Sequence, residues 1–221
     1  MTSLVWPLLA TMKVEEREAF LALARPRAFT RNEVVCHEGD PADTLHLVET
    51  GHLAVRSGLA TGVTATLTIL SSGDYFGELA LLRQDRRRTA TVMALEPSRT
   101  LSVAAAAFDK LCVRNPHIER VLSALLADRV DALSRRLLET MYESLDRRVY
   151  RRLVELANAY GVDDGTAAIP LSQAHLADLV GAARPSVNQV LKRLADQNLV
   201  KLGRERIELV DVAALARRYP Q

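Results

Sequence analysis

Residues 73–92 read GDYFGELALLRQDRRRTATV and combine a glycine turn, a carboxylate and a run of arginines. Gly77 allows the backbone to approach a ligand closely and to present amide N–H groups to an anion. One arginine of Arg86–Arg88 can pair with a phosphate through two parallel hydrogen bonds. Glu78 suits a ligand that also offers hydroxyl groups, because a carboxylate commonly accepts a hydrogen bond from a ribose. The stretch therefore predicts a nucleotide-phosphate site, the alternative being an exposed turn and a solvated basic run.

The region around this stretch is punctuated by glycine. Six of the ten glycines fall between residues 39 and 77, and turn residues separate short runs that alternate or carry β-branched side chains. The clearest of these runs are Leu45–Val48, Leu53–Arg56 and Thr64–Leu70. Short strands at this spacing predict that residues 28–103 form an all-β roll or barrel.

Helical patterns lie on both sides of the β region. Residues 13–23 predict a short amphipathic helix that ends before Pro26. Its apolar residues available for a core are Val14, Phe20 and Leu23. Residues 104–110 predict one or two further helical turns, which the Asn115-Pro116 pair ends.

A long helix is predicted to begin at Pro116, because a proline fits the first helical turn, and to reach about Glu143. Its apolar residues recur mainly at spacings of three and four, at Leu122, Leu125, Leu126, Val130, Leu133, Leu137 and Met141. A stripe sustained over about seven turns predicts a seam with a second copy of the chain. Packing of this helix on its own β region is the alternative.

The chain after Ser144 alternates short helices with turns. Ser144 supplies a helix cap, which places the start of a new domain near residues 140–146. Gly181 separates two short helices, and Pro185 falls in the first turn of the second. The predicted elements are a helix over 145–159, an extended piece over 167–171, a helix opening at Ser172, a helix over 184–197, and a hairpin of 199–202 with 207–210. This order is typical of a winged helix-turn-helix.

The helix over 184–197 separates apolar from polar side chains. Its inward stripe consists of Val187, Val190, Leu191 and Leu194. The opposite face carries the arginine and amide groups that read guanine and adenine in a major groove, unless it is merely a solvated polar face. The predicted DNA-binding residues are Arg184, Pro185, Ser186, Asn188, Gln189 and Lys192, with Ser172, Gln173 and Arg204. Arg193, Lys201 and Arg206 are predicted to suit phosphates.

Composition excludes several classes of protein. Of the 221 residues, 48% are hydrophobic and 25% charged, which excludes a disordered or collagen-like chain. The net charge is +2; residues 1–144 carry 17 basic and 18 acidic groups, and residues 145–221 carry 12 and 9. A basic C-terminal third permits a polyanionic partner without establishing one. The two cysteines, Cys36 and Cys112, are too few for a disulfide framework. No segment has the pattern of an export signal or of a membrane span. We therefore expect a soluble, cytoplasmic protein.

The motifs together resemble the CRP/FNR family of bacterial transcription regulators, named after the cyclic AMP receptor protein and the fumarate-nitrate regulator. Phe76-Gly77-Glu78-Leu79, followed eleven residues after Gly77 by Arg88-Thr89-Ala90, resembles that family's phosphate-binding cassette. The helix-turn-helix resemblance is carried by Val180-Gly181, Arg184, Ser186-Val187 and the exit at Asp196-Gln197-Asn198-Leu199. Glu38-Gly39-Asp40, Gly51, Gly73-Asp74 and Asn115-Pro116 also agree, so that the resemblance covers about residues 8–212.

The resemblance implies an α+β fold in three parts. These are a cyclic-nucleotide-binding β-roll (1–115), a dimerisation helix (116–143) and a winged helix-turn-helix (144–221). It also implies a homodimer that binds near-palindromic double-stranded DNA, has RNA polymerase as a further partner and performs no catalysis. The effector would be cyclic AMP or cyclic GMP, with no other cofactor.

Ligand roles follow by position from the resemblance. Arg88 would pair with the cyclic phosphate and Glu78 would accept from the ribose 2′-hydroxyl. Gly77, Glu78 and Ala90 would supply backbone contacts, and Thr89 a hydroxyl. The remaining residues assigned to the pocket are Leu79, Val55, Leu67, Leu133 and Ser134.

The chain departs from the family pattern at three positions. Leu133-Ser134 stands where the family has a Thr-Ser pair that reaches the purine, so one base-reading hydrogen bond is lost and the base becomes an open question. Pro185 replaces a glutamate that accepts from cytosine, and Ala183 replaces a capping serine.

These departures leave alternatives open. One is a constitutive or differently liganded regulator with a vestigial pocket, in which Leu133 itself stabilises the DNA-competent arrangement. Four of the histidines, His37, His46, His52 and His117, leave a haem version open, whereas two cysteines are too few for an iron–sulfur version. A nucleotide hydrolase or transferase lacks any nucleophile–base grouping. A sensor that docks a protein through its winged helix would show no salt-dependent binding to DNA.

Overall fold

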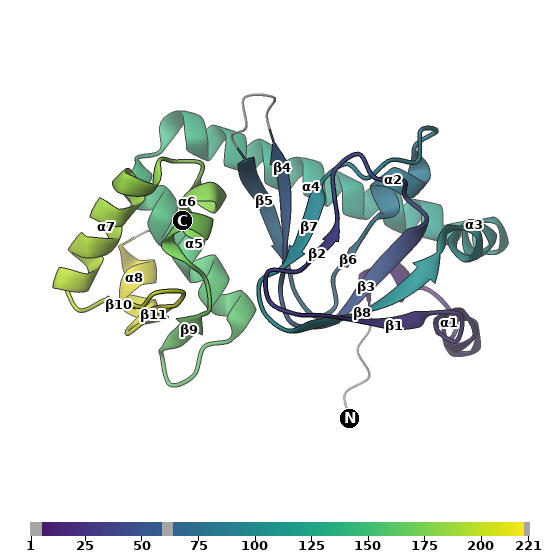
Figure 1. Ribbon diagram of the computed structural model, residues 1–221, viewed down its shortest axis with the longest axis horizontal. Coiled ribbons are helices and arrows are strands. Elements are labelled where there is room, and N and C mark those ends of the chain that lie inside the picture. The colour runs from purple at the N-terminus through teal and green to yellow at the C-terminus, as the bar shows by residue number, and fades with distance from the viewer. Residues whose placement is uncertain (1–5, 59–63, 219–221) are drawn as a thin grey trace. The chain divides into compact units, whose positions relative to one another are not determined.

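The computed structural model describes residues 6–58 and 64–218 (Figure 1). The chain divides into two compact units. Of the described residues, the first unit contains 6–58 and 67–131 and the second contains 64–66 and 132–218, so that one division falls inside helix α4 (His117–Tyr142). The predicted three-part division at residues 115 and 143 stays a prediction. Within the described ranges, none of the helices is long and apolar enough to cross a membrane.

The first unit contains a roll of two four-stranded antiparallel sheets, as the glycine-punctuated runs predict. One sheet has the order β1-β8-β3-β6 and the other β2-β7-β4-β5. The strands are β1 (Arg25–Phe29), β2 (Val34–Cys36), β3 (Thr44–Thr50), β4 (Leu53–Gly58), β5 (Thr64–Leu70), β6 (Tyr75–Phe76), β7 (Thr91–Ala94) and β8 (Ser98–Ala104). Pro26 lies in β1 rather than ending a helix, and it is tolerated there because β1 is an edge strand.

Strand β3 divides the apolar core between its two faces. Leu45 and Leu47 point to a cluster shared with the helices, which includes Phe20, Phe108 and Ile118. The alternate residue Val48 belongs to a second cluster inside the roll, with Phe29, Leu53, Leu70, Phe76, Val92 and Ala94. This two-residue period is what an extended strand with both faces covered produces.

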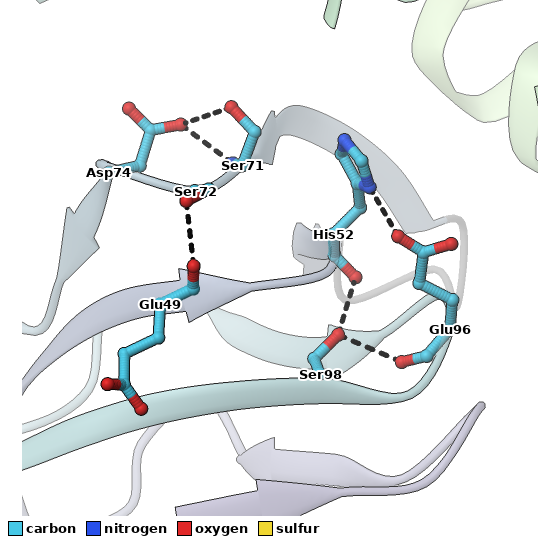
Figure 2. A network of polar contacts seen from close by, with 7 residues as sticks. All are labelled: Glu49, His52, Ser71, Ser72, Asp74, Glu96 and Ser98. Carbon is cyan, nitrogen blue, oxygen red and sulfur yellow. Dashed lines mark hydrogen bonds and ion pairs between the residues drawn. The ribbon is translucent and has the colours of Figure 1, made fainter. Parts of the chain in front are cut away.

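Three turns at one end of the roll are tied together by polar contacts (Figure 2). His52 Nδ1 lies 2.5 Å from a carboxylate oxygen of Glu96, and the Ser98 hydroxyl donates to the Glu96 carbonyl at 2.8 Å. The Ser72 hydroxyl donates to the Glu49 carbonyl at 2.7 Å, and Asp74 accepts from Ser71. Gly51 is required here, because a Cβ would lie 2.8 Å from the Pro97 carbonyl oxygen. His52 therefore contributes to the turn structure.

The helices of the first unit differ in part from the prediction. Helix α1 (Val14–Leu21) buries Phe20, but Val14 and Leu23 are exposed, so their expected place in the core was wrong. Leu23 lies beyond the end of the helix, and Val14 lies in its first turn. Helix α3 (Ala105–Arg114) is longer than the one or two turns expected, and the 3-10 turn η1 (Pro7–Leu9) and helix α2 (Glu78–Leu82) were not predicted.

The second unit has the predicted winged helix-turn-helix order. Its helices are α5 (Leu145–Tyr160), α6 (Gln173–Val180), α7 (Arg184–Asp196) and α8 (Val212–Arg217), of which α8 was not predicted. The wing is a sheet of order β10-β11-β9, formed by β10 (Val200–Leu202), β11 (Ile207–Leu209) and β9 (Ala167–Ile169). Gly181, with φ +67°, ends α6 and makes the turn into α7.

Candidate ligand site and DNA-reading helix

The three consecutive arginines have three different environments. Arg86 pairs with Asp109 at 2.9 Å on the surface, and Arg87 donates to the Gly39 carbonyl at 2.7 Å while remaining exposed. Arg88 is buried, with 6% of its surface exposed. Arg88 is therefore the arginine of the run that is available to an enclosed ligand, whereas Arg86 and Arg87 make contacts on the surface.

Arg88 is only partly satisfied by the protein. Its Nη2 donates to the hydroxyl of Thr44 at 2.7 Å, and the nearest carboxylate oxygen, of the exposed Asp43, is 3.9 Å away. Its Nε and Nη1 are buried without a hydrogen-bond partner in the described structure. Buried donors are nearly always paired, and a buried guanidinium without an ion pair is costly. Two unpartnered nitrogens of a buried cation, which together carry three N–H donors, are therefore the chemistry that an anionic ligand would complete.

Gly77 lies against Arg88 and takes a backbone conformation that other residues avoid. Its φ is +97°, and a Cβ at this position would lie 2.7 Å from the Thr44 carbonyl oxygen and in contact with the Arg88 guanidinium. The turn into α2 therefore needs glycine both for its dihedral angle and for the space.

Glu78, which follows, is almost fully buried and forms an ion pair that the sequence did not reveal. A carboxylate oxygen accepts from Arg129 of α4 at 2.7 Å. Burial raises the pKa of Glu78 above its ordinary value, while the attraction of Arg129 acts in the opposite direction. The partner was missed because Arg129 lies 51 residues away, in a helix with many charged side chains.

The other predicted ligand residues are distributed around this centre. Ala90 is buried, Leu79 and Val55 are half-buried, and Thr89 and Leu67 are exposed. Leu133 and Ser134 are exposed on α4, within the second unit. A cavity of about 1100 Å³ opens between β1, α1 and α3, and Arg88 is the predicted ligand residue that belongs to its lining, together with Thr44 and His46.

Helix α7 presents the predicted DNA-reading face. Val187, Val190, Leu191 and Leu194 are buried, as the stripe predicted. Arg184, Pro185, Gln189 and Lys192 are exposed, whereas Ser186 and Asn188 are half-buried. Outside α7, the Ser172 hydroxyl caps α6 by accepting from the His175 amide at 3.2 Å, Gln173 is half-buried, and Arg204 is exposed between β10 and β11.

Two of the cations assigned to phosphates are already paired within the second unit. Arg193 forms an ion pair with Asp146, and Arg206 lies 2.9 Å from a carboxylate oxygen of Glu208. Among the described residues, neither Lys192 nor Lys201 forms an ion pair like those of Arg193 and Arg206. The predicted phosphate role of Arg193 and Arg206 stays a prediction: each would exchange a carboxylate for a phosphate, and ion pairs between exposed side chains are weak.

A ligand-binding β-roll joined to a winged helix-turn-helix defines a class of ligand-responsive transcription regulators, and comparison with known proteins agrees. Residues 26–115 match the cyclic nucleotide-binding domain family, and residues 147–218 match the Crp-like helix-turn-helix domain family. The cAMP-activated global transcriptional regulator CRP of Pasteurella multocida is 31% identical over 186 residues, which cover 83% of this chain and 88% of that protein.

A second relative and a solved structure are also similar to this chain. The CRP-like cAMP-activated global transcriptional regulator of Mycobacterium tuberculosis is 29% identical over 92% of this chain and 93% of its own length. The fold of the c-di-GMP responsive global regulator CLP of Xanthomonas campestris matches with a TM-score of 0.75 at 22% identity, covering 89% of this chain and 99% of that one. The chain belongs to the CRP/FNR family of transcription regulators. The relatives are regulators and not enzymes, which confirms the prediction for this chain.

Proposed function

We propose that the chain is a homodimeric regulator whose DNA affinity is set by a cyclic nucleotide bound at Arg88. The observation that carries this proposal is the buried Arg88, whose Nε and Nη1 have no hydrogen-bond partner among the described residues, beside the glycine turn at Gly77. A cyclic phosphodiester carries the single negative charge that such a guanidinium would pair with. Glu78 lies one residue further on and offers a carboxylate for a sugar hydroxyl.

Cyclic AMP is the first candidate for this ligand. The Pasteurella multocida and Mycobacterium tuberculosis relatives are named as cAMP-activated. Leu133, in place of a hydroxyl-bearing residue, would leave one edge of the purine without a hydrogen bond, so cyclic GMP belongs in the same experiment. Because the similar Xanthomonas campestris regulator is named as c-di-GMP responsive, cyclic di-GMP is the third compound to test.

The proposed dimer would use the exposed apolar stripe of α4. Val130, Leu133, Leu137 and Met141 are each about half exposed or more in the single chain. Apolar residues repeating at spacings of three and four along a long helix are typical of a seam with a second helix. Burial of this stripe by a second copy would remove from water the largest row of exposed apolar side chains that α4 carries.

DNA recognition would follow from the dimer. Two α7 helices about 34 Å apart would enter successive major grooves of a near-palindrome. Arg184 can read a guanine with two hydrogen bonds, and Lys192 suits a phosphate. RNA polymerase would be the further partner of the DNA-bound dimer.

The test of the ligand is a titration with fluorescent cyclic AMP, cyclic GMP and cyclic di-GMP. Arg88→Leu should abolish binding while the protein stays folded, and Arg87→Leu is the matched control because Arg87 lies exposed one residue away. Binding by the wild type and the control but not by Arg88→Leu supports the proposal. Wild-type affinity in Arg88→Leu would remove Arg88 from the site. A wild type that binds none of the three compounds would favour the constitutive regulator with a vestigial pocket.

The DNA role is tested by selecting bound duplexes from a random library and comparing the selected duplex with a scrambled one. Arg184→Ala should reduce the preference for the selected duplex, because a bidentate base contact contributes about 1–3 kcal/mol of discrimination. Arg193→Ala should leave that preference unchanged, since Arg193 pairs with Asp146 and a phosphate contact in its place would carry no sequence information. Unchanged discrimination in Arg184→Ala would assign the reading of sequence to another residue.

A further inference from the structure

A continuous set of polar contacts leads away from Arg88 into the roll. The Thr44 hydroxyl accepts from Arg88 Nη2 at 2.7 Å and lies 3.2 Å from His46 Nε2. The other ring nitrogen, His46 Nδ1, lies 3.0 Å from the hydroxyl of Thr100. Neither the recognised cassette nor the predicted pocket includes Thr44, His46 or Thr100.

These residues are held in place by burial and by packing against the cassette. His46 and Thr100 are buried, and the imidazole stacks on the ring of Phe76, with centroids 4.7 Å apart and planes 8° apart. His46 also pairs with Phe76 across strands β3 and β6. Phe76 immediately precedes Gly77. His46 therefore contacts strand β6, which leads into the Gly77 turn, and it also contacts Arg88 through the Thr44 hydroxyl.

The set of contacts carries no charge of its own at neutral pH. Burial lowers the pKa of His46 to about 4, and the nearby charges of Arg88 and Arg27 act in the same direction, while Asp43 acts against them. A neutral imidazole has one donor and one acceptor nitrogen. The Thr44 hydroxyl can then donate to His46 Nε2, or donate to Asp43 Oδ1 at 3.1 Å while His46 donates to it. In both arrangements its oxygen still accepts from Arg88.

We infer that Thr44 and His46 are positioning residues that fix the Arg88 guanidinium for an anionic ligand without neutralising it. A buried carboxylate in the same place would hold the arginine more strongly but would cancel the charge that attracts a phosphate. The carboxylate that is nearby, Asp43, has a side chain 86% exposed to solvent and 3.9 Å away. The inference rests on the proposed function for the identity of the ligand, but not for the conformation of Arg88.

The first experiment compares affinities for fluorescent cyclic AMP in four proteins. Thr44→Val keeps the shape of the side chain and removes the hydroxyl, whereas Thr44→Ser keeps the hydroxyl and is the matched control. His46→Phe keeps a ring to stack on Phe76 and removes both nitrogens. Loss of one hydrogen bond to a charged group should weaken binding roughly ten-fold in Thr44→Val and several-fold in His46→Phe, with Thr44→Ser close to wild type.

The second experiment needs no ligand and therefore separates this inference from the proposed function. NMR of the ¹⁵N-labelled guanidinium, assigned by the loss of signals in Arg88→Leu, reports whether Arg88 is held. We expect separate, slowly exchanging Nη signals in the wild type and Thr44→Ser, and averaged signals in Thr44→Val and His46→Phe. If the wild type binds no cyclic nucleotide, the proposed function fails and these spectra still decide the positioning role.

Two results would overturn the inference. One is an Arg88 spectrum in Thr44→Val that equals the wild-type spectrum. The other is a loss of affinity in Thr44→Ser as large as in Thr44→Val, since that would make the effect one of packing. If Thr44→Val does not fold, His46→Phe tests the same contacts, because His46 holds the Thr44 hydroxyl that binds Arg88. Averaged Arg88 signals in His46→Phe would then support the inference, and signals equal to the wild type would overturn it.

Discussion

Replacing Arg129 by methionine should destabilise the N-terminal unit by leaving a buried carboxylate without its ion-pair partner. The Glu78 side chain is 2% exposed and the Arg129 side chain 38% exposed, with 2.7 Å between Nη1 and Oε1. Methionine preserves most of the apolar stem of arginine, so that the change removes mainly the charge and its hydrogen bond. Leaving the enclosed Glu78 without a partner should therefore cost more stability than leaving the more exposed Arg129 without one.

The expected magnitude follows from this asymmetry. Removing one partner of a buried pair costs about 3–5 kcal/mol when the remaining charge cannot reach water. In Arg129→Met the remaining charge is the enclosed Glu78, so we expect a loss of about 3 kcal/mol in the free energy of unfolding at pH 8. In Glu78→Gln the remaining charge is Arg129, which is partly hydrated and keeps an amide oxygen as acceptor, so the loss should be about 1 kcal/mol.

The pH dependence of the Arg129→Met penalty has a definite sign. Burial already raises the pKa of Glu78, and removing Arg129 raises it further because that attraction lowered it. Between the ordinary value of 4.5 and the raised pKa, the folded state keeps a proton that the unfolded state has released. The free energy of unfolding then falls as pH rises through this window. The penalty should shrink from pH 8 toward pH 5.

The assay is urea unfolding followed by the fluorescence of Trp6, the sole tryptophan of the chain. Trp6 is buried in the N-terminal unit and donates its indole N–H to the Val48 carbonyl at 3.1 Å, so its signal reports that unit. Equal losses in Arg129→Met and Glu78→Gln, or an Arg129→Met penalty of the same size at pH 5 and pH 8, would refute the reasoning.

Three further changes test separate parts of the structure. His46 should contribute a loss of about 3 kcal/mol of unfolding free energy to the wild type between pH 6.5 and about 4, because the unfolded state protonates this side chain before the folded state does; His46→Phe should therefore lose less stability than the wild type over this range in Trp6-monitored unfolding, and equal losses would exclude the His46 contribution. Gly77→Ala should cost about 1–3 kcal/mol and exceed the cost of Gly39→Ala, whose φ is also positive but whose Cβ would meet open space; equal costs would exclude the clash with the Thr44 carbonyl. Leu137→Glu should give monomers in sedimentation experiments, whereas Leu82→Glu, at an apolar residue of similar exposure outside α4, should not; dimers in both would remove the α4 stripe from the interface.

The sequence was sufficient for the architecture because periodicity and turn residues are local signals. The run Leu45–Val48 in β3 and the apolar stripe in α7 are visible in a few consecutive residues; the run forms a strand and the stripe is buried, as predicted. The errors occur where a short segment depends on distant contacts. Val14 is apolar but lies in the first turn of a helix that buries Phe20 alone, and Leu23 lies beyond the end of that helix. The five-residue α2 was missed because it depends on the turn at Gly77 and on the burial of Ala80 and Leu81.

The candidate site was predictable in its chemistry but not in its contacts. Spacing and residue type singled out Gly77, Glu78 and one of three adjacent arginines. They could not show that Arg88 is the buried one, because Asp109 and the Gly39 carbonyl, which engage its neighbours, are distant in sequence. The contacts of Glu78 with Arg129 and of Arg88 with Thr44 span 51 and 44 residues. His46 was counted among scattered histidines, and only the register of β3 with β6 and β8 places it beside the cassette.

The most direct test of the account is the affinity of the full chain for its selected duplex, measured with and without saturating cyclic AMP, cyclic GMP or cyclic di-GMP. The account predicts that one of them tightens DNA binding in the wild type and in Arg87→Leu but not in Arg88→Leu. Because linkage is reciprocal, DNA should tighten binding of that nucleotide by the same factor. Equal affinity for the duplex in the presence and absence of every nucleotide would contradict it.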